Sequence, residues 1–153
     1  ARITDTRKTM PGLRLLDKYA VVAGGGVNHR MGLYDEVMIK DNHIAAAGDI
    51  AAAVAAARGT HGSDIRVIVE VEDLDQLEEV LGTTADRVLL DNMDIATLAR
   101  AVELVGDSME TEASGGVTLD TVRAIAGTGV GYISVGWITH SAPQLDIALD
   151  FVS

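Results

Sequence analysis

Residues 36–43 read EVMIKDNH, and this stretch decides how the rest of the chain is interpreted. Its apolar residues predict the end of a short buried strand, and four polar residues follow at once: Lys40, Asp41, Asn42 and His43. An alanine-rich run then predicts a helix, for which Asp41 or Asn42 would be the N-cap. Helix capping alone would explain these polar residues, but polar residues also follow the apolar run of nearly every other predicted strand.

Apolar runs and helix-forming stretches alternate along the chain at a spacing of about 20 to 35 residues. We expect strands at 2–6, 36–39, 65–71, 87–90, 108–112 and 131–135. We expect helices at 13–22, 44–58, 74–81, 95–105 and 119–126, and a strand or short helix at 145–152. Alternating strands and helices indicate a parallel sheet with helices outside it.

Two features favour a barrel over a doubly wound sheet. No glycine-rich dinucleotide fingerprint opens the first predicted helix. Polar residues also follow most predicted strands, as they do at the mouth of a barrel. They are Arg7 and Lys8, Lys40, Glu70 and Glu72, Asp91 and Asn92, Glu112, and Gly136. An eight-stranded barrel usually needs about 250 residues, so a chain of 153 residues predicts an open barrel of roughly six strands.

The composition limits the classes of protein and partner. Hydrophobic residues make up 48% and charged residues 23%, which indicates a globular chain. The absence of cysteine excludes disulfides and thiolate chemistry, and it is compatible with an intracellular setting. The net charge of −11 argues against a nucleic-acid partner. No apolar run is long enough to span a bilayer, so we expect no membrane partner.

Basic residues are concentrated in the first third of the chain. Residues 1–43 hold seven Lys or Arg residues against five acidic residues, whereas the remaining 110 residues hold five against 18. A local cationic pocket can bind anions whatever the overall charge of the protein. The distribution therefore predicts an anion site, with chance placement of surface charge as the alternative.

Two pairs of neighbouring residues are candidates for this anion site. Arg7 and Lys8 follow the first predicted strand, and a turn would be needed to bring both toward one site, because successive strand residues face opposite ways. Arginine binds carboxylates bidentately, and lysine is a point charge suited to phosphate. His29 and Arg30 follow three glycines, which equally fit a mobile loop or a helix C-cap. Each pair would also be unremarkable as solvated surface.

Acidic and glycine-rich segments follow other predicted strands. Glu70 and Asp91 each follow an apolar run and would hold a divalent cation, bind sugar hydroxyls or cap a helix. No His or Cys spacing supports zinc. The Ser-Gly-Gly of 114–116 and Gly136 would present backbone N–H groups to a phosphate, as the last loops of a barrel often do. This mouth suits a ligand with carboxylates, phosphates and a metal-bridged pyrophosphate.

A long ordered series of motifs resembles the quinolinate phosphoribosyltransferase family, the decarboxylating nicotinate-nucleotide pyrophosphorylases. The motifs are Thr6-Arg7-Lys8-Thr9, Pro11-Gly12-Leu13-Arg14, GGGVNHR at 24–30, IKDNH at 39–43, VEVE at 69–72, LLDN at 89–92, EASGG at 112–116 and Val135-Gly136. The resemblance runs from Ala1 to about Val152. It implies an open six-stranded parallel (β/α) barrel like those of type II phosphoribosyltransferases. It also implies that residues 1–153 are one barrel domain, with the family's N-terminal α/β domain absent from this chain.

The resemblance further implies a reaction. Quinolinate and phosphoribosyl pyrophosphate would give nicotinate mononucleotide, pyrophosphate and carbon dioxide with Mg²⁺, in the de novo synthesis of NAD. The implied setting is a cytoplasmic homodimer or higher homo-oligomer, in which the N-terminal domain of a neighbouring subunit completes the site.

The family's functional residues carry over by position. The resemblance assigns the quinolinate carboxylates to Arg7, His29, Arg30 and Lys40, and the pyrophosphoryl donor to Lys8. It assigns the ribose hydroxyls and the metal, directly or through the donor and water, to Glu70 and Asp91. It assigns the 5′-phosphate to Ser114, Gly115, Gly116 and Gly136, with His140 nearby, and it adds Thr6, Val135 and Trp137 to the substrate-binding residues. Lys8, Lys40, Glu70 and Asp91 are the implied catalytic residues.

Two departures and three alternatives accompany this interpretation. Met10 stands where Thr or Leu is more familiar, and Trp137 stands where a small residue is more familiar and would crowd the phosphate loop. One alternative is a paralogous phosphoribosyltransferase acting on another base, such as the relative associated with molybdenum transport. The others are a phosphosugar aldolase or isomerase barrel with Lys40 as the amine nucleophile, and a non-catalytic metabolite-binding domain.

Overall fold

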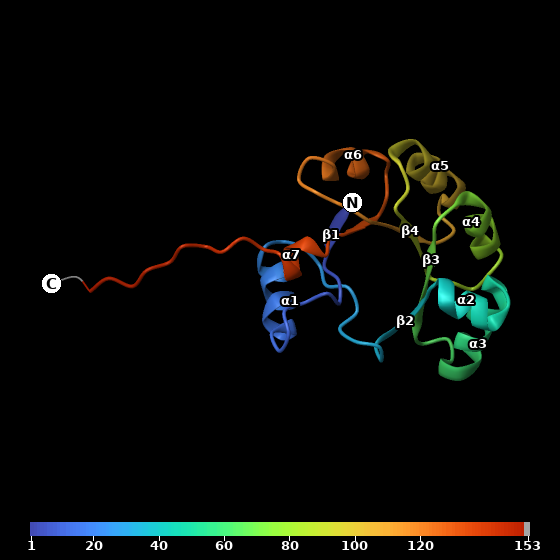
Figure 1. Ribbon diagram of the computed structural model, residues 1–153. Helices are drawn as coiled ribbons and strands as arrows, with labels where there is room; N and C mark the ends of the chain where they lie inside the picture. Colours follow the sequence, from blue (N-terminus) through green and yellow to red (C-terminus); the bar gives the residue numbers. More distant parts are fainter. Residues whose placement is uncertain (152–153) are drawn as a thin grey trace.

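The computed structural model describes residues 1–151, which form an open barrel of parallel strands surrounded by helices (Figure 1). The strands are β1 (Arg2–Thr4), β2 (Glu36–Ile39), β3 (Arg66–Val71), β4 (Arg87–Asp91), β5 (Glu110–Ser114) and β6 (Tyr132–Ser134). The helices are α1 (Arg14–Ala23), α2 (Asp41–Ala47), α3 (Ile50–His61), α4 (Leu74–Leu81), α5 (Ile95–Val105), α6 (Val122–Gly127) and α7 (Trp137–His140). The strand order is β1-β6-β5-β4-β3-β2.

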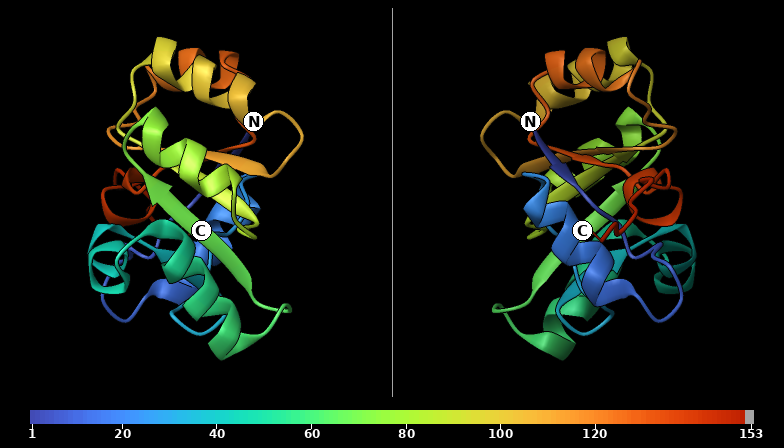
Figure 2. Two further views of the ribbon diagram at one scale, coloured as in Figure 1. Left: turned by 90° about the vertical axis from the view of Figure 1, so that its right-hand side faces the viewer. Right: turned by 90° about the vertical axis from the view of Figure 1, so that its left-hand side faces the viewer.

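The barrel is open between β1 and β2, which are the two edges of the sheet over residues 1–151. All five neighbouring pairs within the sheet are parallel. Helix α1 contacts α7, and the two lie side by side next to β1, whereas α2 to α6 cover the outside of the curved sheet (Figures 1 and 2). The predicted open six-stranded α/β barrel is confirmed.

The hydrophobic core lies between the sheet and the outer helices, not inside the barrel. Val67, Val69 and Val71 of β3 are fully buried and belong to one cluster with Leu77 of α4 and Leu98 of α5. Because successive strand residues point to opposite faces, the residues between these valines face the barrel interior. From β3 the interior therefore receives Arg66, Ile68 and Glu70, of which two are charged.

Those interior side chains form an ion-pair network at the end of the barrel opposite the mouth. Arg87 lies beside Glu110, with Nη2 2.8 Å from its carboxylate, and Arg66 also pairs with Glu110. The Arg87 guanidinium lies over the Tyr132 ring, 3.9 Å from its centroid, which adds a cation–π contact. This network occupies the base of the barrel, at the end opposite the mouth.

Several predicted bounds are shifted by one to three residues, and the short helix α7 was not expected. Three further differences concern how elements begin, break or form. The helix expected at 44–58 is two helices, because Gly48 has φ +106 and Asp49 caps α3 by accepting the Ala52 N–H. The N-cap of α2 is Lys40, so the expected Asp41 or Asn42 cap was wrong. Residues 141–151 form neither the strand nor the helix expected there, and they run away from the barrel (Figure 1). The remaining residue of that predicted element, 152, lies outside the described residues.

In the described part of the chain, no helix has the length and apolar character that a membrane span requires.

Candidate active site

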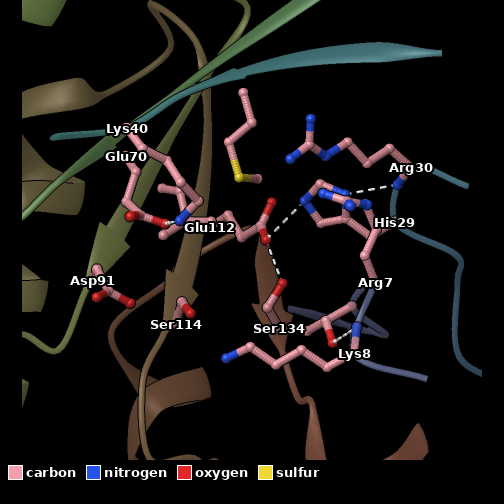
Figure 3. A pocket seen from close by; sticks show the side chains of 13 residues that line it. Arg7, Lys8, His29, Arg30, Lys40, Glu70, Asp91, Glu112, Ser114 and Ser134 are labelled. Atoms are coloured by element: carbon pink, nitrogen blue, oxygen red, sulfur yellow. Dashed lines mark hydrogen bonds and ion pairs between the residues drawn. The ribbon is translucent and has the colours of Figure 1, made fainter. Parts of the chain in front are cut away.

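A cavity of about 350 Å³ opens at the carboxyl ends of the strands (Figure 3). It is lined by Thr6, Arg7, Lys8, His29, Arg30, Met38, Lys40, Glu70, Leu89, Asp91, Glu112, Ser114 and Ser134. All six strands or the segments directly after them supply lining residues, since parallel strands bring their carboxyl ends to one mouth, and His29 and Arg30 join them from the segment between α1 and β2. The structure thus gathers nine of the predicted site residues in one cavity.

Lys40 stands at the junction of β2 and α2, and its position is fixed by the helix that follows it. The ring Nδ1 of His43 accepts the Lys40 N–H at 2.9 Å, as the third residue of a helix does in a capping box. The Lys40 ammonium forms an ion pair with Glu70 at the end of β3 (Figure 3). His43 therefore stabilises the helix start, and Lys40 is left to project into the cavity.

Arg7 and Arg30 come from separate loops and approach each other at one wall of the cavity (Figure 3). The pKa of Arg30 lies below its ordinary value, because burial disfavours its charge and Arg7 repels it, although Glu36 and Asp35 oppose the change. The Arg7 Nε is buried and has no hydrogen-bond partner within residues 1–151. Two neighbouring guanidiniums with an unpaired buried donor are suited to a planar anion such as a carboxylate.

A buried ion pair holds the loop that carries Arg30. Lys18 of α1 is 1% exposed and lies 2.5 Å from Asp5, which is fully buried after β1. Lys18 also donates to the His29 carbonyl at 2.8 Å, and Asp5 accepts the His29 N–H at 2.9 Å. With its amide oriented to satisfy the network, Asn28 donates to Asp5 at 2.7 Å. These bonds fix the backbone of 28–30 against β1, so Arg7 and Arg30 can meet.

Glu112 is a fully buried acid beneath the cavity. Burial alone would raise its pKa, but contacts with His29, Ser134 and Arg87 outweigh burial and hold the pKa below its ordinary value. Arg87 Nη1 donates to it at 3.0 Å, and the Ser134 hydroxyl also donates to it. Glu112 is therefore an ionised group that links the base of the barrel to the mouth.

Glu70 and Asp91 are the carboxylates at the rim. Glu70 pairs with Lys40, and Asp91 accepts a hydrogen bond from the Asn92 amide at 2.7 Å. No cluster of three or more His, Cys, Asp or Glu side chains suited to a metal ion occurs within residues 1–151. Magnesium is commonly bound by one or two carboxylates together with substrate phosphates, and the rim carboxylates fit that arrangement.

The glycine-rich segments lie at the edge of this cavity. Gly115 has φ +100, and a Cβ there would lie 2.6 Å from Asn92 Cγ, so only glycine fits. A Cβ on Gly136 would lie 3.1 Å from His140 Nε2, which places His140 beside Gly136. Gly115, Gly116, Val135, Gly136, Trp137 and His140 do not line the cavity itself. Trp137 borders a separate apolar cavity with Val135 and residues 117–122.

Four cavity residues were not among the predicted site residues: Met38, Leu89, Glu112 and Ser134. Met38, Leu89 and Glu112 lie two positions before the predicted rim residues Lys40, Asp91 and Ser114. The period-two alternation of a strand puts residues two apart on one face, so this spacing was a signal that could have found them. Glu112 is one of the polar residues that follow the predicted strands, but the sequence alone assigns it no role.

The fold and the mouth define an α/β barrel whose cavity is lined by both cationic and acidic side chains. The family model described as "Quinolinate phosphoribosyl transferase, C-terminal domain" matches residues 1–150. The chain belongs to this family.

Proteins that are similar to this chain bear names of the same family. A "Probable nicotinate-nucleotide pyrophosphorylase [carboxylating]" of Bacillus subtilis is 52% identical over 149 residues, which are 97% of this chain and 52% of that protein. The chloroplastic enzyme of that name from Arabidopsis thaliana is 49% identical over 167 residues, with 97% of this chain and 48% of that protein covered. The crystal structure of NadC from Streptococcus pyogenes superposes with a TM-score of 0.91 at 43% identity, covering 95% of this chain and 51% of that one. The chain thus spans about half the length of these relatives.

Proposed function

We propose that the protein containing this domain transfers a phosphoribosyl group from phosphoribosyl pyrophosphate to quinolinate, with loss of carbon dioxide, to give nicotinate mononucleotide. The observation that carries this proposal is the meeting of Arg7 and Arg30, opposite Lys40, in one cavity of about 350 Å³. Three cations suit a small aromatic dicarboxylate, because each carboxylate can be held by a charge-assisted hydrogen bond. Family membership supports the same substrates.

The cationic and the acidic residues of the mouth would have separate roles in the reaction. Arg7, Arg30 and Lys40 would orient quinolinate so that its ring nitrogen faces the sugar C1 of the donor, and Lys8 would stabilise the departing pyrophosphate. Glu70 and Asp91 would stabilise the positive charge that develops on the ribose, since glycosyl transfer passes through an oxocarbenium-like state. The pyridinium nitrogen formed by the transfer would then stabilise the carbanion that loss of carbon dioxide leaves on the ring, until a proton from solvent replaces the lost carboxylate.

The 5′-phosphate would bind beside the glycine-rich segments. The backbone N–H groups of 114–116 and Gly136 would donate to its oxygens, with His140 beside Gly136. Thr6, Val135 and Trp137 would lie near the phosphate without binding it directly.

Magnesium is the proposed cofactor, and it would be held largely by the oxygens of the donor. Glu70 and Asp91 would contribute directly or through water. The ion would supply charge neutralisation of the pyrophosphate.

The proposed assembly is a homodimer or higher homo-oligomer in the cytoplasm. We propose that residues 1–153 are the barrel domain of a longer enzyme, and that an N-terminal domain of a neighbouring subunit completes the mouth. Leu15, Leu16 and Tyr19 of α1 are 63% to 74% exposed, which is typical of a surface that is covered in an assembly. For comparison, the names of relatives from plants include mitochondrial and chloroplastic proteins.

An assay of the full-length protein tests the function. We expect nicotinate mononucleotide and pyrophosphate to form from quinolinate, the donor and Mg²⁺, and activity to fall sharply in Arg30→Ala. Use of another base with rejection of quinolinate would instead support the paralogous transferase. Reductive trapping of Lys40 by borohydride with a carbonyl substrate would support the aldolase alternative. Quinolinate binding without turnover would support a metabolite-binding domain.

A comparison of this 153-residue chain with the full-length protein tests the assembly. We expect the shorter chain to be nearly inactive and to associate irregularly in light scattering, and the longer one to form a discrete oligomer. A monodisperse, fully active 153-residue chain would contradict this.

A further inference from the structure

We propose that Glu112 is a positioning residue that acts through His29 to hold Arg30 in the geometry that binds a substrate carboxylate. The proposal deepens the proposed function and rests on it for its kinetic part. Glu112 lies beneath the cavity and is fully buried, so an ionised group is kept there at a cost in desolvation. A buried charge with defined partners on both sides is suited to fixing the orientation of its neighbours.

The first step of the argument is the imidazole of His29. Its Nδ1 accepts the backbone N–H of Arg30 at 2.7 Å. An imidazole nitrogen that accepts carries no proton, so in the neutral ring the proton lies on Nε2. Nε2 is buried and lies 3.2 Å from Glu112 Oε1, close enough for electrostatic attraction, but no partner among residues 1–151 meets it with hydrogen-bond geometry. The Glu112 carboxylate therefore favours the tautomer that keeps Nδ1 free to hold Arg30.

The second step is that both ring nitrogens of His29 face the protein. The side chain of His29 is only 5% exposed, and Glu36 is the other charged group near Nδ1, at 3.8 Å. In this arrangement Nδ1 carries no proton to offer a ligand, and Nε2 faces Glu112. His29 thus links Glu112 to the backbone of Arg30, whose guanidinium lines the same cavity (Figure 3).

The third step is that Glu112 is itself held on three sides. Oε2 accepts from Arg87 at 3.0 Å, while Oε1 accepts from Ser134 and faces His29. Every contact of this carboxylate is with an N–H or O–H donor. A glutamine at this position has one oxygen and one NH₂ group, so it must turn a donor toward either Arg87 or the His29 side. Glu112→Gln therefore disrupts the chain of contacts while keeping size and shape.

The barrel offers a matched control. Glu110 also binds Arg87, at 3.0 Å from Nε, but it is partly exposed at the base and makes no contact with His29. If Glu112 serves only to neutralise Arg87, Glu110→Gln and Glu112→Gln should have similar effects. If it acts through His29, only Glu112→Gln should alter the site.

The kinetic test uses full-length protein. For Glu112→Gln we expect the KM for quinolinate to rise on the order of tenfold to a hundredfold, as small misplacements of binding groups do. The KM for phosphoribosyl pyrophosphate should change less than twofold, and Glu110→Gln should leave both constants near wild type. In a His29→Ala background, Glu112→Gln should add little, because the link is already broken. An unchanged KM for quinolinate, equal effects of the two glutamines, or full additivity with His29→Ala would each overturn the proposal.

A second measurement needs no substrate, so it tests the coupling of Glu112 to His29 independently of the proposed function. Ring ¹⁵N NMR of histidine-labelled full-length protein near pH 8, assigned by loss of the signal in His29→Ala, should show a proton on Nε2 and none on Nδ1. In Glu112→Gln this tautomer should lose its dominance. A proton on Nδ1 in the wild type overturns the inference whatever the enzyme does. A wild type that does not use quinolinate overturns the proposed function, and the tautomer then decides the coupling of Glu112 to His29 by itself.

Discussion

Lys40 and Glu70 form an ion pair across the ends of the adjacent strands β2 and β3. The Lys40 side chain is 41% exposed and Glu70 is 18% exposed, so the pair lies at the rim of the cavity and outside the core. Such pairs contribute only about 0 to 1 kcal/mol to stability. Its placement is therefore better explained by ligand binding than by folding, because a bound carboxylate would compete with Glu70 for the ammonium.

The first prediction concerns Lys40→Ala in the full-length protein. We expect quinolinate binding to weaken by about 1.5 to 3 kcal/mol, the range for hydrogen bonds to charged groups. Calorimetric titration measures the affinity, and thermal unfolding should show a small change. Arg100→Ala is the matched control, since it removes the exposed Arg100–Glu103 pair of α5, which lies outside the cavity. A large fall in melting temperature with unchanged affinity would contradict the assignment.

The second prediction concerns the rim carboxylates. Asp91→Asn and Glu70→Gln keep size but remove charge, so we expect the KM for phosphoribosyl pyrophosphate and the Mg²⁺ requirement to rise. Quinolinate affinity measured without the donor should change little. Asp94→Asn, at the N-cap of α5, alters a nearby helix start but not the cavity, and it should spare the kinetics. Loss of quinolinate affinity with normal use of the donor would reverse the roles.

The elements with clear end signals could be predicted from the sequence. Helices α4 and α5 have the predicted bounds, because an aspartate N-cap precedes each helix and a glycine follows it. The break at Gly48 was missed although Asp49 is a cap of the same kind, since the surrounding alanines favour one continuous helix. The apolar residues of 145–151 fit a strand or a short helix, but either needs a surface to pack against, and the described residues provide none.

The rim of the site was also predictable, whereas its supports were not. Lys40, Glu70 and Asp91 end apolar runs, and parallel strands bring such ends together. The meeting of Arg7 with Arg30 depends on the buried pair of Asp5 and Lys18. Those two residues sit in a loop and on a helix, and no periodicity pairs them. Long-range pairing of buried charges is decided by tertiary packing, which a local pattern does not contain.

The third prediction contrasts the two glycines after β5. Gly115→Ala places a Cβ 2.9 Å from Asn92 N in a left-handed conformation, so both strain and collision are expected. Gly116 has φ +56, but a Cβ added there would meet no atom within 4 Å. Gly116→Ala should therefore cost only the backbone strain of about 1 to 2 kcal/mol. Denaturant unfolding should rank Gly115→Ala as the less stable variant, and its KM for the donor should rise more. Equal losses of stability in the two variants would show that Asn92 moves aside to make room for the Cβ at position 115.

The last prediction concerns acid stability and Glu112. Its pKa in the folded protein is below the ordinary value, because contacts with His29, Ser134 and Arg87 outweigh the effect of burial. A depressed folded-state pKa stabilises the fold above the unfolded-state value of about 4.3, and this contribution is lost as the pH falls through the folded-state pKa. Glu112→Gln removes that titration.

We therefore expect wild-type full-length protein to lose stability more steeply than Glu112→Gln as the pH falls from 5 toward 2. At pH 7 the variant should be less stable by about 1.5 to 3 kcal/mol, because the Arg87 and Ser134 donors lose a charged acceptor. Urea unfolding across this pH range measures both effects, and the two curves should converge in acid. Parallel curves would mean that the pKa of Glu112 is the same in the folded and unfolded states, and its contacts with Arg87 and His29 would then not favour the ionised form.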